Sequence, residues 1–125
     1  MLSQFPVYGI LVASDLERAK QFYTEKLGLK PVDGPPGIAI FAAGDQTRVV
    51  IYEKEGGPKA TNTVLGFSVT NLEQVLADLK AAGVEQDLAD LPAEAKDGVV
   101  SYGPVKSAWI KDSEGNIIGL NEMIG

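Results

Sequence analysis

The sequence predicts an α+β fold built from two similar modules, each with one strand, one helix and then three antiparallel strands. An apolar strand, a helix-capping pattern, a helix and a glycine stop occur early in the chain and recur in the same order about 55 residues later. After each stop, short β-rich runs are separated by glycine, proline and aspartate. Because chance rarely supplies so long an ordered repeat, we predict two copies of a βαβββ unit.

The first helix is predicted from Asp15 to Leu27 by its start signal, its apolar stripe and its stop. Ser14 and Glu17 have the spacing of a capping box, in which the serine oxygen accepts a hydrogen bond from a backbone N–H. Leucine, alanine and aromatic side chains then recur along one helical face. Gly28 ends the helix, because glycine readily adopts the left-handed conformation.

The second helix repeats these signals over Leu72 to Ala82, with Thr70 and Glu73 as its capping box and Gly83 as its stop. Each helix follows a short apolar strand. The predicted strands are 7–13, 29–32, 38–42 and 47–53 in the first module, and 63–69, 106–111 and 117–123 in the second.

Both modules are assigned to one domain over residues 1–125, with module one at 5–54, a linker at 55–61 and module two at 62–125. The linker is rich in glycine but lacks the lysine pattern of a phosphate-binding loop. The second module is about 12 residues longer than the first, and the extra residues lie around 91–98. This connection is either a binding loop or a surface loop without a binding role, and both interpretations are open.

Composition narrows the classes of partner. The net charge of −6 opposes binding to phosphate backbones, so we expect no nucleic-acid partner, whereas a cationic ligand is permitted. No apolar run approaches the roughly 20 residues that span a bilayer, and the first residues lack the pattern of a signal peptide. We therefore expect no membrane partner and a cytoplasmic location. The absence of cysteine excludes disulfides, thiolate metal sites and a cysteine nucleophile.

A tight turn completes the pattern near the end of the chain. It reads Asp112-Ser113-Glu114-Gly115-Asn116 and is followed by Ile117-Ile118-Gly119-Leu120. With the paired modules, this turn resembles the vicinal oxygen chelate superfamily, which includes glyoxalases, bleomycin resistance proteins, fosfomycin-modifying enzymes and extradiol dioxygenases. The resemblance spans nearly the whole chain. It implies the glyoxalase/bleomycin resistance/dioxygenase fold, in which two βαβββ modules form a cupped mixed sheet around a ligand-binding cleft.

Enzymes of that superfamily generally hold a divalent metal, through histidine and glutamate, that polarises vicinal oxygens of the substrate. The resemblance places the ligand positions on Tyr8, Val64 and Gly119, none of which is an ordinary metal ligand. The chain contains no histidine at all, which removes the commonest nitrogen ligand and general base. We therefore expect no metal, no other cofactor and no catalytic residue, with an all-carboxylate magnesium or calcium site as the alternative.

The expected ligand site is an apolar cup with a few hydroxyl and amide groups, the usual composition of a small-molecule pocket. Strand alternation places Tyr8 and Ile10 on one face of module one, and Val64 and Ser68 on the equivalent face of module two. The resemblance adds two residues of the last strand, and three aromatic residues complete the cup. The expected ligand-binding residues are Tyr8, Ile10, Tyr52, Val64, Ser68, Tyr102, Trp109, Gly119 and Asn121. Packing in the core or an interface is the alternative for Tyr8 and Trp109.

These observations favour a metal-free small-molecule-binding protein that resembles a bleomycin resistance protein and sequesters a cationic or amphipathic ligand. The alternative is a lyase, isomerase or dioxygenase of the same superfamily with an unconventional or absent metal, so enzymatic activity stays open. A third hypothesis is a structural or regulatory dimer without a ligand. Strand 7–13 is apolar on both faces, and superfamily members commonly complete their clefts across a two-fold axis. We therefore expect a homodimer, with Tyr8, Val64 and Gly119 near the subunit boundary.

Overall fold

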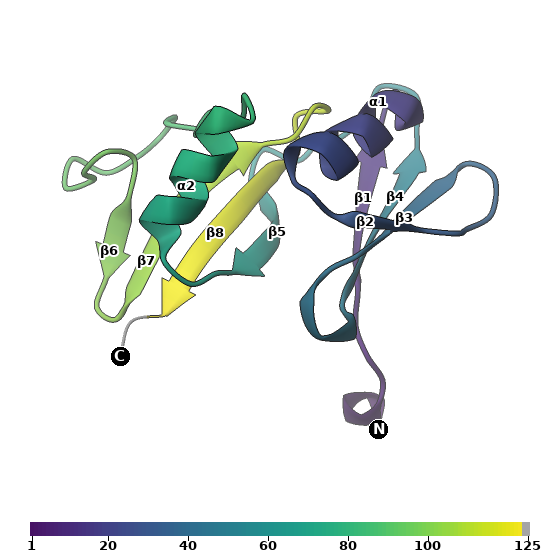
Figure 1. Cartoon of the computed structure of the whole chain (residues 1–125), viewed down its shortest axis with the longest axis horizontal. Coiled ribbons are helices and arrows are strands. Elements are labelled where there is room, and N and C mark those ends of the chain that lie inside the picture. The colour runs from purple at the N-terminus through teal and green to yellow at the C-terminus, as the bar shows by residue number, and fades with distance from the viewer. Residues whose placement is uncertain (124–125) are drawn as a thin grey trace. The chain divides into compact units, whose positions relative to one another are not determined.

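The computed structural model describes residues 1–123, which form two compact units (Figure 1). The first unit is Met1–Lys59 and the second begins at Ala60, so the division falls inside the predicted linker. Each unit contains one four-stranded sheet and one α-helix that lies across it. This is the α+β fold of two βαβββ modules that the sequence predicts. Within residues 1–123, no helix has the length and hydropathy needed to cross a membrane.

The sheet of the first unit has the strand order β1-β4-β3-β2, with β1 parallel to β4 and the other pairs antiparallel. One face is buried and packs against the helix, whereas the opposite face is apolar and partly exposed. Ile10, for example, is 57% exposed on this open face. The strands are β1 (Gly9–Ala13), β2 (Lys30–Val32), β3 (Ile38–Ala42) and β4 (Arg48–Glu53). The buried face consists of Leu11, Ala13, Ala39, Phe41, Val49 and Ile51.

The first helix is not the single α-helix that the sequence predicts. It comprises α1 (Leu16–Gln21) and a π-helical turn over Phe22–Lys26. The Leu27 N–H donates to the Phe22 carbonyl at 3.2 Å, a bond five residues back along the chain. Within this turn Tyr23 is fully buried, and its ring stacks on Phe41 with the ring centroids 5.5 Å apart.

Both helices are capped one residue later than the predicted capping boxes. Asp15 Oδ1 accepts a hydrogen bond from the Arg18 N–H at 3.1 Å, and Asn71 Oδ1 accepts one from the Gln74 N–H at 3.4 Å. Ser14 Oγ instead accepts a bond from the Arg18 guanidinium at 3.1 Å. Aspartate and asparagine rank among the strongest N-cap residues. Asn71 also has a φ of 53°, a left-handed conformation that asparagine tolerates better than most residues.

The sheet of the second unit has the order β5-β8-β7-β6, with β5 parallel to β8 and the other pairs antiparallel. Its helix is α2 (Leu72–Ala81), which begins where the sequence predicts. The strands are β5 (Thr63–Ser68), β6 (Val100–Tyr102), β7 (Val105–Lys111) and β8 (Ile117–Met123). The buried side chains of the helix-covered face include Ala108, Ile110, Ile118 and Leu120.

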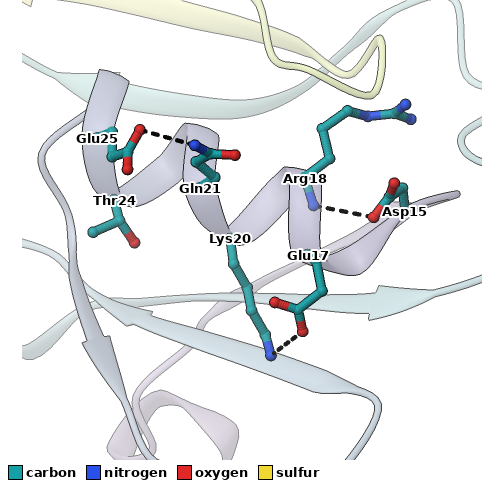
Figure 2. Close-up of a pocket in the computed structure, with 7 residues that line it drawn as sticks. All are labelled: Asp15, Glu17, Arg18, Lys20, Gln21, Thr24 and Glu25. Atoms are coloured by element: carbon teal, nitrogen blue, oxygen red, sulfur yellow. Dashed lines mark hydrogen bonds and ion pairs between the residues drawn. The ribbon is translucent and has the colours of Figure 1, made fainter.

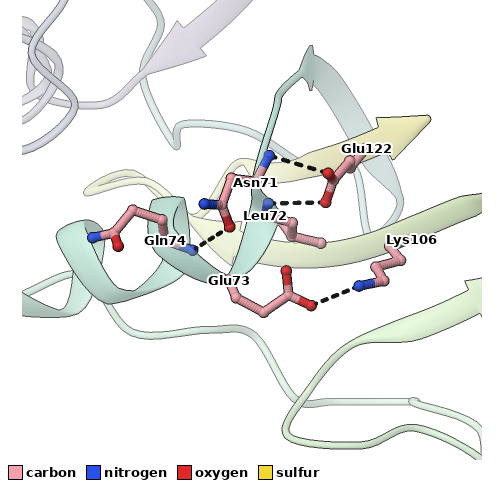
Figure 3. A network of polar contacts seen from close by, with 6 residues as sticks. All are labelled: Asn71, Leu72, Glu73, Gln74, Lys106 and Glu122. Atoms are coloured by element: carbon pink, nitrogen blue, oxygen red, sulfur yellow. Dashed lines mark hydrogen bonds and ion pairs between the residues drawn. The ribbon is translucent and has the colours of Figure 1, made fainter. Parts of the chain in front are cut away.

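A polar network from the sheet fixes the start of α2 (Figure 3). The Glu122 carboxylate accepts hydrogen bonds from the backbone N–H groups of Asn71 at 3.1 Å and Leu72 at 3.0 Å. Both are amides at a helix N-terminus, where a negative charge is favourable. Glu122 therefore has a structural role on the helix-covered face of β8.

An exposed ion pair lies beside this network. Lys106 Nζ lies 2.9 Å from Glu73 Oε1; this bond lowers the pKa of Glu73 and raises the pKa of Lys106. The ionised Glu73 carboxylate therefore stabilises the fold at pH values above its usual pKa, and this stabilisation is lost as the pH falls through the lowered pKa. The Lys106 contribution is present below its usual pKa and lost as the pH rises through the raised value. Because both groups are exposed, solvent screens the pair.

The turn between β7 and β8 is a buried hydrogen-bonded unit. Asp112, which is only 7% exposed, accepts bonds at Oδ1 from the N–H groups of Glu114 at 2.9 Å and Asn116 at 2.8 Å. Its Oδ2 accepts a bond from Asn116 Nδ2 at 2.8 Å. Gly115 has a φ of 96°, which an L-residue with a side chain rarely adopts. Aspartate, glycine and asparagine at these spacings are therefore explained by the structure of the turn.

Candidate ligand-binding groove

A groove of about 560 Å³ lies on the second unit, at the face of the sheet that α2 does not cover. Five lining side chains share this open face: Thr63, Tyr102, Trp109, Lys111 and Ile117. Ile117 pairs with both Thr63 and Lys111, and Trp109 lies on the same face of β7 as Lys111 and as Val105, which pairs with Tyr102. The linker supplies further lining residues from Ala60 onward. The groove thus combines aromatic and polar side chains, as small-molecule sites usually do.

The long connection after α2 forms another wall of the groove through Asp87, Asp90, Leu91 and Pro92. This connection is held against the sheet, because the Asp87 N–H donates to the Trp109 carbonyl at 2.7 Å. Asp87 Oδ1 also accepts a bond from the Ala89 N–H at 3.2 Å. The extra length of the second module therefore contributes directly to the groove.

Strand register brings four of the expected ligand-binding residues together on the open face of the second sheet. Trp109 and Gly119 are directly paired, as are Ser68 and Asn121. Ser107 Oγ donates to Asn121 Oδ1 at 2.6 Å, which fixes the orientation of this amide. Tyr102 lies on the neighbouring strand and lines the groove with Trp109.

Val64, another of the expected ligand-binding residues, lies at an irregularity of β5. The pairing register shifts between Thr63 and Leu65, so simple alternation does not relate Val64 to the residues that follow it. Thr63 is the residue beside Gly119: a Cβ built on Gly119 would lie 3.3 Å from Thr63 Cγ2. The bulge was not expected from the sequence, because no glycine or proline marks it.

The remaining three expected residues belong to the first unit. Ile10 and Tyr52 lie on its open face, where Ile10 pairs with Val50 and Val12 pairs with Tyr52. Tyr8 precedes β1 rather than lying within it, and it is 60% exposed. The strand predicted from residue 7 therefore begins two residues later.

A second hollow, of about 570 Å³, lies along the outer side of α1 (Figure 2). Its polar side chains bond to one another along the helix rather than pointing into a shared space. Lys20 Nζ lies 3.1 Å from Glu17 Oε1, and Gln21 Nε2 donates to Glu25 Oε2 at 3.2 Å. These contacts join residues three or four positions apart, as on any solvated helix surface. We therefore interpret this hollow as helix surface.

Residues 1–123 do not supply the set of metal ligands that the resemblance implies. Within residues 1–123, no three histidine, cysteine, aspartate or glutamate side chains are grouped so that they could hold a metal. Gly119 has no side chain, and the nearby Glu122 is bonded to the start of α2 on the opposite face. The metal site that the resemblance implies therefore does not fit these residues.

Comparison with known families agrees with this architecture. The model of the Glyoxalase/Bleomycin resistance protein/Dioxygenase superfamily matches residues 6–120. The chain belongs to this superfamily. The resemblance drawn from the paired modules and the Asp112 turn is therefore confirmed, and the superfamily includes both binding proteins and enzymes by its description.

Solved structures show the same fold. TnmS3, an antibiotic binding protein from Streptomyces sp. CB03234, is 25% identical, with a TM-score of 0.73 and 93% of each chain covered. A glyoxalase family protein from Enterococcus faecalis is 23% identical, with a TM-score of 0.71, 98% of this chain and 100% of that chain covered. Lactoylglutathione lyase from Agrobacterium tumefaciens is 18% identical, with a TM-score of 0.70 and coverage of 94% and 92%. No curated protein matches the sequence.

Sequence reasoning missed part of the groove. Thr63 was not singled out, and Asp87 and Asp90 lie in a connection with no fixed predicted path. The available signal was the extra length of the second module. It predicted that a loop exists but gave no indication of the face over which the loop folds.

Proposed function

We propose that this superfamily member binds a flat, cationic or amphipathic small molecule in the groove of its second unit, without a metal. The observation that carries the proposal is that Trp109 and Tyr102 line the same groove as Asp87 and Asp90. Aromatic rings attract planar and cationic groups, and carboxylates attract positive charge. Lys111 is the basic side chain at the groove, so acidic groups outnumber it among the lining residues.

Two further observations support a binding role. The antibiotic-binding protein TnmS3 has the same fold at 25% identity. The net charge of −6 favours a cationic small molecule over a nucleic acid. A metal-dependent lyase, isomerase or dioxygenase is less well supported, because the expected ligand positions are occupied by Tyr8, Val64 and Gly119. A cytoplasmic location remains part of the proposal, and cell fractionation would test it.

Titration with N-methylacridinium and with its neutral analogue acridine tests this function. Trp109 is the only tryptophan in the sequence, so its fluorescence reports on the groove. We expect saturable quenching by N-methylacridinium, a higher unfolding midpoint in its presence, and about fivefold weaker binding of acridine, because two partly exposed carboxylates contribute modestly.

The matched control is the double variant Asp87→Asn, Asp90→Asn, which keeps the size and hydrogen-bonding oxygen of both side chains. It should bind the two acridines with equal affinity. Unchanged Trp109 emission at saturating N-methylacridinium would contradict a ligand groove at this position, and equal binding of both probes to the unaltered protein would contradict a cationic ligand.

We also propose that the protein is a homodimer. The open face of the first sheet exposes apolar side chains, with Ile10 57% and Tyr52 39% exposed. β1 is also the edge strand of that sheet, and an exposed edge favours pairing or cover. A second copy of the chain would cover the same surface on both molecules.

Light scattering tests the dimer. The unaltered protein should give twice the chain mass of 13.2 kDa, and the Ile10→Asp variant should give the mass of one chain. A mass of one chain for the unaltered protein at micromolar concentration would contradict the dimer.

A further inference from the structure

Two glycines, Gly66 and Gly119, lie side by side on the open face of the second sheet and form what we call the glycine floor. Gly66 pairs with Gly119, and Gly119 pairs on its other side with Trp109. No Cβ therefore covers the backbone of β5 and β8 at this level, which allows close approach of a ligand. A Cβ on Gly119 would lie 3.3 Å from Thr63 Cγ2, and both Thr63 and Trp109 line the groove. The glycine floor thus adjoins the groove.

Two nitrogen donors border the space above this floor. The Cβ position of Gly119 lies 3.6 Å from Trp109 Nε1 and 3.6 Å from Asn121 Nδ2. Asn121 Oδ1 already accepts the bond from Ser107, which leaves its amide nitrogen on the side of Gly119. Over the residues that the structure describes, neither nitrogen donates to a protein acceptor, and no buried side-chain nitrogen lacks a partner. Both donors are therefore accessible to a ligand.

We propose that Trp109 Nε1 and Asn121 Nδ2 form a subsite for a carbonyl oxygen carried by a planar ligand. This inference rests on the proposed function and specifies the chemistry of its ligand. A ring lying on the glycine floor would bring its carbonyl oxygen above Gly119, beyond the Cβ position and within hydrogen-bonding reach of the two nitrogens. Both N–H groups would donate to the same oxygen, which has two lone pairs. A neutral oxygen is favoured over an anion, because Asp87 and Asp90 lie in the same groove.

Discrimination should follow from the two donors. A ligand with the carbonyl oxygen replaces the water molecules that hydrate these N–H groups, whereas a ligand with a methylene in its place leaves both donors unpaired. Sites built to hydrogen-bond a ligand reject analogues that lack the bonding atom. The subsite therefore predicts a preference that depends on one atom of the ligand.

The test compares 2-acetylnaphthalene with 2-isopropenylnaphthalene, in which a methylene replaces the carbonyl oxygen. We expect the ketone to bind about tenfold tighter. In ¹⁵N-edited NMR spectra, the single indole N–H resonance, from Trp109, should move downfield with the ketone and not with the alkene.

Two variants test the subsite residues. Asn121→Asp keeps the acceptor for Ser107 but removes the Nδ2 donor, and Gly119→Ala fills the space above residue 119 with a methyl group. Both variants should lose the preference for the ketone, with thermal unfolding as the check that each is folded.

The outcomes separate the subsite from the groove. If both probes shift the groove resonances and bind equally, the carbonyl subsite is wrong and groove binding stands. If neither probe shifts Trp109 or the backbone amides around it, the subsite is overturned, and the acridine titration decides the proposed function separately. A ketone preference that persists in both variants would also overturn the subsite.

Discussion

Replacing Tyr23 by alanine is expected to lower the free energy of unfolding by about 4 kcal/mol, in the range for large buried aromatic residues. Tyr23 is fully buried, stacks on Phe41 and contacts the Phe22 ring edge-on with the centroids 5.7 Å apart. Truncation would leave a cavity between the π-helical turn and the sheet of the first unit. Urea denaturation followed by circular dichroism measures this change.

Tyr102→Ala is the matched control for this prediction. Tyr102 lies on the open face of the second sheet, outside the proposed dimer surface, and is 57% exposed, so its truncation should cost less than about 1 kcal/mol. Equal costs for the two tyrosines would contradict the large contribution expected from the burial of Tyr23.

Replacing Asp112 by alanine is expected to cost about 3 kcal/mol. The change removes three hydrogen bonds to a carboxylate and leaves the backbone N–H and the side-chain amide of the buried Asn116 without these acceptors. Hydrogen bonds to charged groups are individually stronger than neutral ones, and unsatisfied buried groups are costly. The same denaturation measurement applies.

Asp112→Asn keeps the shape of the side chain but cannot offer acceptors at both positions, so it should cost less than the alanine variant. Glu114 provides a second comparison, because its backbone N–H rather than its side chain bonds to Asp112, so Glu114→Gln should be nearly neutral. A loss below about 1 kcal/mol for Asp112→Ala would contradict a structural role for the Asp112 carboxylate in this turn.

The modules were predictable because their signals are local. Strand, helix and glycine stop recur within each half, and both helices and seven of the eight strands lie near the predicted ranges. The capping residues were not predictable to the exact position, because Ser14-Asp15 and Thr70-Asn71 each place two capable side chains side by side. The π-helical turn was missed because one inserted residue barely disturbs an apolar stripe.

The site was predictable only where strand pairing preserves simple alternation. Trp109, Gly119 and Asn121 share the expected face because β7 and β8 pair without a shift. Val64 lies at a bulge, which alternation does not anticipate. The groove wall that carries Asp87 and Asp90 depends on how the long connection folds back on β7. This contact, made by the Asp87 N–H, is non-local and carries no sequence signature.

The most direct test of a metal-free binding groove is a titration with N-methylacridinium on protein first dialysed against EDTA. Trp109 emission should give the same dissociation constant in EDTA and in solutions containing Mg²⁺, Mn²⁺ or Zn²⁺, because the lining residues bind the ligand directly. Binding that disappears in EDTA and returns with one of these ions would contradict the account.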